Sequence, residues 1–270
     1  MRRTSWMFLI VAMCVAMLTI TPCANAALTV TTMNSSVTVD PLSQAGMNNW
    51  TVDGVNQMYQ QWFWYRIGAT GPESAINTIS APTVATAAGR QIETMYSNAT
   101  LSVDVLYSLT GGTAGSHTSD VAETISIVNN SASAFTIHFF QYSDFDLNGA
   151  IGGQTATFIS PNGFQQTGPA GGAVMTETVT TPAPNTHEAN TYANTLNSLN
   201  DANPTTLNGA NSATGDATWA FGWDQTIAAG GTFIISKDKN IRAAVPEPAS
   251  MMMLGGVMLL ISRKLRKVTA

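Results

Sequence analysis

Hydrophobic and polar residues alternate along most of the chain, in short runs that clusters of Gly, Pro, Asn and Ser interrupt. A period of two is typical of strands that bury one face, and the interrupting clusters are typical of turns. The predicted strands are residues 28–39, with a break near Asn34 and Ser35, and then 91–96, 101–109, 121–128, 135–147, 155–159, 164–167, 173–181, 217–226 and 232–236.

Turns of four or five residues join several of these strands in sequence. A short turn between two alternating runs favours an antiparallel hairpin. We therefore predict four hairpins, made by strands 91–96 with 101–109, 121–128 with 135–147, 155–159 with 164–167, and 217–226 with 232–236.

A further strand is predicted at residues 55–68, where five aromatic residues occur within seven positions. This density suits a central strand that is covered on both faces. Arg66 lies in this apolar neighbourhood and needs an oxygen partner if it is partly buried, and Glu73 is the nearest candidate.

Residues 186–199 form the one helix predicted between the two termini, from the spacing of Tyr192, Leu196 and Leu199. Residues 110–119 and 200–216 are predicted loops, and the strands and turns predicted between residues 27 and 244 have the regular spacing of a β-sandwich. The predicted fold is therefore all-β, a single antiparallel β-sandwich domain, with a signal helix before it and a short hydrophobic helix after it.

Residues 1–26 have the composition of a secretory signal peptide: a basic start, an apolar stretch and small residues at the end. Ala24 and Ala26 occupy the small positions, so cleavage is predicted before Ala27. Cleavage there removes both cysteines of the chain, and the exported domain then forms no disulfide. A lipoprotein signal at Cys23 is the alternative, but the proline directly before this cysteine argues against it.

Residues 245–270 carry a second targeting pattern, which begins with Pro246, Glu247 and Pro248. Two prolines this close together cannot continue a helix or a central strand. The 14 uncharged residues 249–262 follow, about 21 Å long as a helix against a hydrocarbon core of about 30 Å. A basic cluster comes next and would stay in the cytoplasm; it consists of Arg263, Lys264, Arg266 and Lys267.

This order of Pro-Glu-Pro, apolar segment and basic cluster resembles the PEP-CTERM sorting signal of exported bacterial proteins. The resemblance implies an exosortase as partner, which recognises and removes the tail, along with export by the Sec translocon and a transient stay in the inner membrane. The protein would end in the cell envelope, at the cell surface or outside the cell. An ordinary tail anchor and a buried C-terminal helix are the alternatives.

The domain between the two targeting segments is strongly acidic. Six of the 11 basic residues lie in those segments but only Glu247 of the 16 acidic ones does, which leaves five basic residues against 15 acidic ones in residues 27–244. No Lys or Arg occurs between Arg90 and Lys237. This charge pattern argues against nucleic acid as a partner and favours solubility.

One stretch carries oxygen ligands at regular spacing. Asp144, Asp146 and Asn148, followed by Gly149, match the first half of a calcium-binding loop, but Thr155 occupies the twelfth position, where such loops have Glu. The flanks are strand-like, and Asn-Gly favours a type I′ hairpin turn. We therefore favour a plain hairpin, with the three side chains on one face of a strand, and expect no cofactor; calcium is the alternative.

Signatures of common catalytic sites are absent from the sequence, including a nucleophile elbow, a zinc-protease motif and a phosphate-binding loop. The sequence thus favours a non-enzymatic protein of the cell envelope or extracellular matrix, with exopolysaccharide as a candidate partner. A hydrolase with paired carboxylates is one alternative. The other is a carbohydrate-binding module, whose aromatic platform would use Trp62, Trp64, Trp219 or Trp223.

Overall fold

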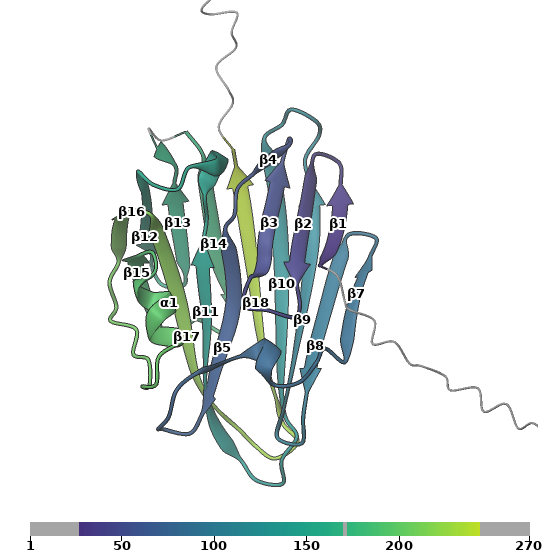
Figure 1. The fold of residues 1–270 in the computed structure, drawn as a ribbon, viewed down its shortest axis with the longest axis vertical. Coiled ribbons are helices and arrows are strands. Elements are labelled where there is room, and N and C mark those ends of the chain that lie inside the picture. The colour runs from purple at the N-terminus through teal and green to yellow at the C-terminus, as the bar shows by residue number, and fades with distance from the viewer. Residues whose placement is uncertain (1–26, 170–171, 244–270) are drawn as a thin grey trace, which may run out of the picture.

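The computed structural model describes residues 27–169 and 172–243, which form two stacked β-sheets (Figure 1). Both sheets are antiparallel apart from one short parallel pairing, so the predicted antiparallel β-sandwich is confirmed. The predicted signal helix and C-terminal hydrophobic helix fall on residues 1–26 and 244–270, outside the described residues.

The first sheet contains the aromatic-rich strand between two neighbours, as a central strand requires. Its strand order is β1 (Leu28–Thr32), β2 (Ser35–Asp40), β3 (Gly46–Val52), β5 (Gln60–Ile67), β11 (Phe135–Asp144), β17 (Ala217–Ile227) and β15 (Thr186–Thr191), with β4 (Val55–Asn56) paired to β3 and β6 (Ser74–Ala75) paired to β5.

The second sheet contains the longer antiparallel ladders. Its order is β16 (Ser212–Gly215), β12 (Gln154–Ile159), β13 (Gly163–Thr167), β14 (Val174–Thr181), β18 (Thr232–Arg242), β10 (Thr118–Asn129), β9 (Leu101–Gly111), β8 (Gln91–Ser97) and β7 (Val84–Ala88). Three short helical turns complete the described chain: η1 (Ile76–Thr78), η2 (Leu147–Gly149) and α1 (Asn194–Leu199).

Two of the four predicted hairpins are confirmed and two are wrong. Strands β8 and β9 pair across their turn, as do β12 and β13. Strands β10 and β11, however, belong to different sheets, and so do β17 and β18. Their connections cross from one layer to the other, and the buried Asn129 holds the two crossings together: its side-chain amide donates to the carbonyl oxygens of Ser133 (2.8 Å) and Ile227 (2.9 Å).

The predicted helix at residues 186–199 is wrong in its first half. Thr186–Thr191 is strand β15, paired along β17, and only Asn194–Leu199 is helical. A six-residue segment beside an existing strand gains ladder hydrogen bonds that an isolated helical turn lacks, so the tertiary environment outweighs the local pattern.

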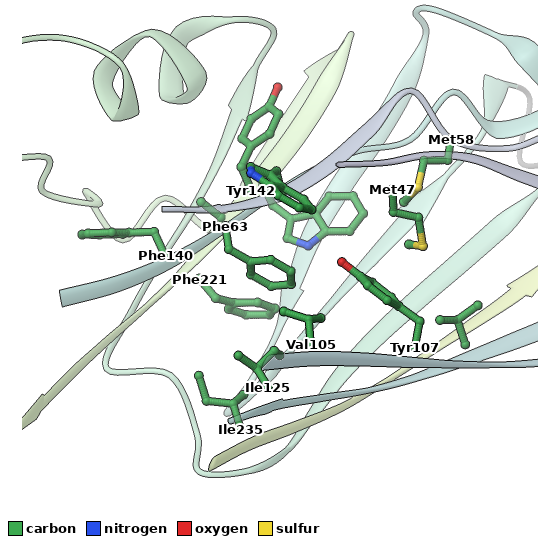
Figure 2. Close-up of a cluster of buried hydrophobic side chains, with 14 of the residues drawn as sticks. Met47, Met58, Phe63, Val105, Tyr107, Ile125, Phe140, Tyr142, Phe221 and Ile235 are labelled. Carbon is green, nitrogen blue, oxygen red and sulfur yellow. The ribbon is translucent and has the colours of Figure 1, made fainter. Parts of the chain in front are cut away.

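Strand β5 buries aromatic side chains on both of its faces. Phe63 faces the second sheet and stacks on Phe139, with ring centroids 5.7 Å apart. Figure 2 draws Phe63 and Phe221 of the first sheet and Val105 and Ile125 of the second sheet, which belong to one cluster of buried side chains. The predicted partner of Arg66 is confirmed, since its Nε lies 2.9 Å from Oε1 of Glu73.

Four charged side chains lie between the sheets with no exposed surface: Glu123 on β10, Glu177 on β14, and Lys237 and Lys239 on β18. Nζ of Lys237 lies 2.6 Å from Oε2 of Glu123 and 3.3 Å from Oε1 of Glu177, and Lys239 bonds to Glu123. The first sheet contributes further donors to the two carboxylates: Gln61 to Glu123, and Gln141 and Trp219 to Glu177.

This buried cluster (Glu123, Glu177, Lys237 and Lys239) balances two negative against two positive charges in the core. Burial alone would raise the pKa of Glu123, but the ammonium groups of Lys237 and Lys239 outweigh that effect and hold the pKa at about 2. A carboxylate in this position is stable only while its cations remain in place.

We expect Lys239→Met to lower the free energy of unfolding by about 3–5 kcal/mol, because it leaves buried carboxylate charge without its partner. Urea denaturation followed by tryptophan fluorescence measures the loss. Arg90→Met removes the same charge from an exposed position and should change stability by less than about 0.5 kcal/mol. Equal effects of the two substitutions would contradict the role given to the cluster.

The buried cluster also predicts how acid acts on the fold. The pKa of Glu123 is about 2 in the folded protein and near 4.5 when unpaired, so its stabilising contribution is complete above pH 4.5 and is lost as the pH falls toward 2. A ¹³C NMR titration of the Glu123 carboxyl should show no protonation between pH 7 and 4. Protonation with a midpoint above pH 4.5 would contradict the pairing.

Candidate functional site

Three aspartates converge where strand β11 ends and the chain leaves the first sheet. Asp144 is the last residue of β11, Asp146 follows two positions later, and Asp216 lies between β16 and β17. One carboxylate oxygen from each residue lies within 4.8 Å of those of the other two. We call Asp144, Asp146 and Asp216 the aspartate cluster.

Asp144 is the buried member of the cluster, with 2% of its surface exposed. Its Oδ2 accepts a long hydrogen bond of 3.4 Å from the hydroxyl of Tyr142, and its Oδ1 has no hydrogen-bond partner within the described residues. Burial, with the nearby charges of Asp216 and Asp146, raises the pKa of Asp144 to about 8. The fold thus places a carboxyl group where ionisation is costly.

The other two members are partly exposed and face the same hollow. Burial raises the pKa of both carboxyls, and for Asp146 the charge of Asp216 adds to the effect. Within the described part of the chain, the basic side chains form their ion pairs with other acids, and none pairs with this cluster. The three carboxyls therefore repel one another without compensation from a protein cation.

The hollow beside the cluster has a volume of about 190 Å³ and is lined in addition by Tyr59, Ile151 and Tyr192. The rings of Tyr59 and Tyr192 meet edge to face, with centroids 5.8 Å apart, and each residue is about half exposed. Backbone hydrogen bonds fix both tyrosines to the cluster: Tyr59 N donates to Asp144 O (3.1 Å) and Tyr192 N to Asp216 O (2.9 Å).

A second hollow, of about 420 Å³, adjoins the first, and both are lined by Tyr59 and Asp146. Its other lining residues are mostly polar: Asn48, Asn56 and Gln60 supply side-chain amides, and Ala45 and Met58 complete the wall. The amides of Asn56 and Gln60 donate to the backbone carbonyl oxygens of Met58 and Gln44, so the two hollows together present the Asn48 side chain, carboxylates and the exposed ring of Tyr59.

The prediction of a hairpin at Asn148 and Gly149 is wrong, although the turn geometry agrees with it. Both residues have positive φ, and Ala150 N donates to Leu147 O at 3.3 Å. However, β11 pairs with β5 and β17, whereas the next strand, β12, belongs to the other sheet. The strand ends at Asp144, so the expected shared strand face of Asp144, Asp146 and Asn148 is also absent from this segment.

Asn148 is exposed and, among the described residues, is not one of those that line the hollow of the cluster. Its backbone N–H donates to Oε1 of Gln57 at 2.8 Å. The structure thus brings Asp144 and Asp146 together as the calcium alternative required, but places Asp216 rather than Asn148 beside them. Tyr59, Tyr192 and Asp216 are the site residues that the sequence did not single out.

The aromatic platform predicted for a carbohydrate-binding module is wrong. Its four tryptophans are at most 1% exposed, and their indole N–H groups are used inside the fold. Trp219 donates to Glu177 (3.1 Å), and Trp223 donates to the carbonyl oxygen of Pro182 (3.1 Å). Trp62 and Trp64 donate to side-chain oxygens of Asn77 and Asn200.

The residues predicted for signal cleavage and sorting, with one exception, lie outside the described residues. They are Ala24, Ala26, Pro246, Glu247, Pro248, Arg263, Lys264, Arg266 and Lys267, whereas Ala27 is the first described residue. Within the described residues, no helix has the length and hydrophobicity needed to span a bilayer. The apolar segment 249–262, predicted as a hydrophobic helix, lies outside them.

Solved structures with a similar fold include proteins that act on carbohydrates. A bacterial glucoamylase in complex with acarbose superposes with a TM-score of 0.53 at 8% identity, over 83% of this chain and 32% of the glucoamylase. A protein of Escherichia coli K12 described as a candidate aldose 1-epimerase gives a TM-score of 0.50 at 9% identity, over 80% of this chain and 98% of the other. This chain thus spans about a third of the glucoamylase. At such identities the likeness shows the fold alone.

No curated protein sequence matches the chain. A family model does match the C-terminal segment: residues 244–267 match the PEP-CTERM protein-sorting motif. The match covers Pro246 to Pro248, the apolar segment and the whole basic cluster, the three features on which the resemblance rested. The chain therefore carries a PEP-CTERM sorting motif, which implies export and sorting by an exosortase.

Proposed function

We propose that this chain is a non-enzymatic protein of the cell envelope or extracellular matrix, exported through the inner membrane and sorted by an exosortase. The observation that carries the proposal is the position of the sorting motif. It begins at residue 244, directly after strand β18 ends at Arg242. The β-sandwich is therefore the part that remains once the tail is removed.

The character of the β-sandwich supports this reading. The four members of the buried cluster pair with one another in the core, and the tryptophans of the domain pack inside the fold. Its acidic excess keeps such a domain soluble at high local concentration outside the cell. An abundant structural or adhesive component of an envelope or matrix needs these properties and no catalytic centre.

We expect the mature protein in its host to lack residues 250–270 and to separate from the inner membrane, because the exosortase removes the tail. Intact-mass analysis of the protein from fractionated cells measures both termini. Deleting residues 263–267 removes the basic cluster and should reduce retention of the tail in the inner membrane during processing. Arg90→Met leaves the motif intact, so this control variant should be processed normally. Stable membrane-embedded protein with its full C-terminus would contradict sorting by this route.

A carbohydrate-binding module is the second candidate function, and one observation favours it. The exposed ring of Tyr59 adjoins a hollow that is also lined by Asn48, whose side-chain amide is partly exposed. A ring face and side-chain amides are the groups that bind the apolar face and the hydroxyls of a sugar. The partner would be an exopolysaccharide of the host.

The test is retardation of the protein in native gels that contain host exopolysaccharide. We expect Tyr59→Ala to reduce this retardation at least fivefold, because the substitution removes the stacking ring. Tyr59→Phe keeps the ring and should retain most of the affinity. Unchanged retardation of Tyr59→Ala would exclude this binding site. The same polysaccharide should be recovered uncleaved, and its cleavage by purified protein, lost in an Asp or Glu variant, would overturn the non-enzymatic proposal.

A further inference from the structure

The aspartate cluster contains a buried oxygen with no partner, which an acidic surface patch would not have. Oδ1 of Asp144 is enclosed and accepts no hydrogen bond from the described residues, although the residue is 98% buried and lines the hollow. A buried carboxylate oxygen without a donor is costly, so structures normally supply one. A ligand with positive charge would satisfy this oxygen.

The spacing of the three carboxylates fits a single cation. Oxygens bound at about 2.4 Å to one calcium ion can be at most about 4.8 Å apart, which is twice that distance. One carboxylate oxygen from each of Asp144, Asp146 and Asp216 meets this limit.

The elements around the cluster fix the carboxylates in place without neutralising them. Backbone hydrogen bonds from Tyr59 and Tyr192 hold the main chain at Asp144 and Asp216, and the left-handed turn after Leu147 returns the chain beside them. The two partly exposed carboxylates, Asp146 and Asp216, face the hollow, where water or a further ligand can complete the coordination of an ion.

We propose that Asp144, Asp146 and Asp216 bind one hard divalent cation, and that calcium fits the site best. The donors are oxygens alone, which hard cations prefer over nitrogen or sulfur ligands. Three carboxylates from two distant segments suit the flexible coordination of calcium better than the strict octahedron of magnesium. The inference is independent of the proposed function, since an envelope protein needs no cation to be sorted.

The test uses the exported protein purified from its host, treated with a chelator and then dialysed into metal-free buffer. Extracellular calcium modules bind with dissociation constants of about 10⁻⁴–10⁻³ M. Binding in that range should raise the melting temperature by about 3–10 °C in 10 mM CaCl₂. Sodium chloride at the same ionic strength should give no comparable rise, and calorimetric titration should show one site.

Asp216→Asn separates binding from a merely structural role. Without calcium this variant should be at least as stable as the natural protein, because it removes a charge that disfavours ionisation of Asp144 and Asp146. In 10 mM CaCl₂ it should lack the rise in melting temperature. Asp146→Asn should behave in the same way and serves as the second variant if Asp216→Asn fails to fold.

Asp238→Asn is the matched control. Asp238 is an exposed carboxylate on β18. The pKa of Asp120 is raised chiefly by the burial of Asp120 itself, and the charge of Asp238 adds to this effect. This substitution also relieves repulsion between two acids, but far from the cluster in sequence, and the variant should keep the full calcium response. A calcium response that Asp216→Asn and Asp146→Asn retain would overturn the inference, and so would the absence of any response in the natural protein.

Discussion

The buried charges between the two sheets constrain the rest of the sandwich. Glu123 and Glu177 lie in the core without access to water, so their carboxylates must be compensated from inside the fold. The two lysines of β18 do this, and they reach both acids only when β18 lies between β10 and β14. The order of the second sheet and the pairing of these charges therefore depend on each other.

The same cluster also joins the two layers. Gln61 of β5 donates to Glu123, and Gln141 of β11 and Trp219 of β17 donate to Glu177, so central strands of the first sheet bond to acids of the second. Apolar packing between sheets is nondirectional, whereas these hydrogen bonds specify which residues face one another. A sandwich of otherwise adaptable aromatic packing thus has one fixed register between its layers.

Sequence patterns predicted the strands better than their partners. Alternation is local, so the break at Asn34 and the strand pair at residues 91–109 followed directly from it. A tight turn looks the same whether it closes a hairpin or crosses between layers, and this is why the pairings of β10 with β11 and of β17 with β18 were mispredicted. The layer to which a strand belongs depends on contacts between residues far apart in the sequence, such as the hydrogen bond from Asn129 to Ile227, which local patterns do not reveal.

The candidate site shows the same limit. The spacing of Asp144 and Asp146 was visible in the sequence, but Asp216 lies on another segment and no spacing rule connects it to them. The tryptophans left two interpretations open, because an aromatic run fits a binding platform and a core strand equally well; the predicted central strand is confirmed and the alternative platform is wrong. Only burial distinguishes the two, and the core uses all four of the rings considered.

The two acidic groups of the fold meet the same physical requirement in different ways. A buried carboxylate must be neutralised, and in the core the lysines of β18 supply the charge. At the end of β11 the described residues supply none, although Asp144 is as enclosed as the core acids. Asp216 lies between β16 of the second sheet and β17 of the first, and Asp144 ends β11 of the first. A cation held between them would therefore supply the missing charge where the chain passes from one layer to the other, as the lysines supply it in the core.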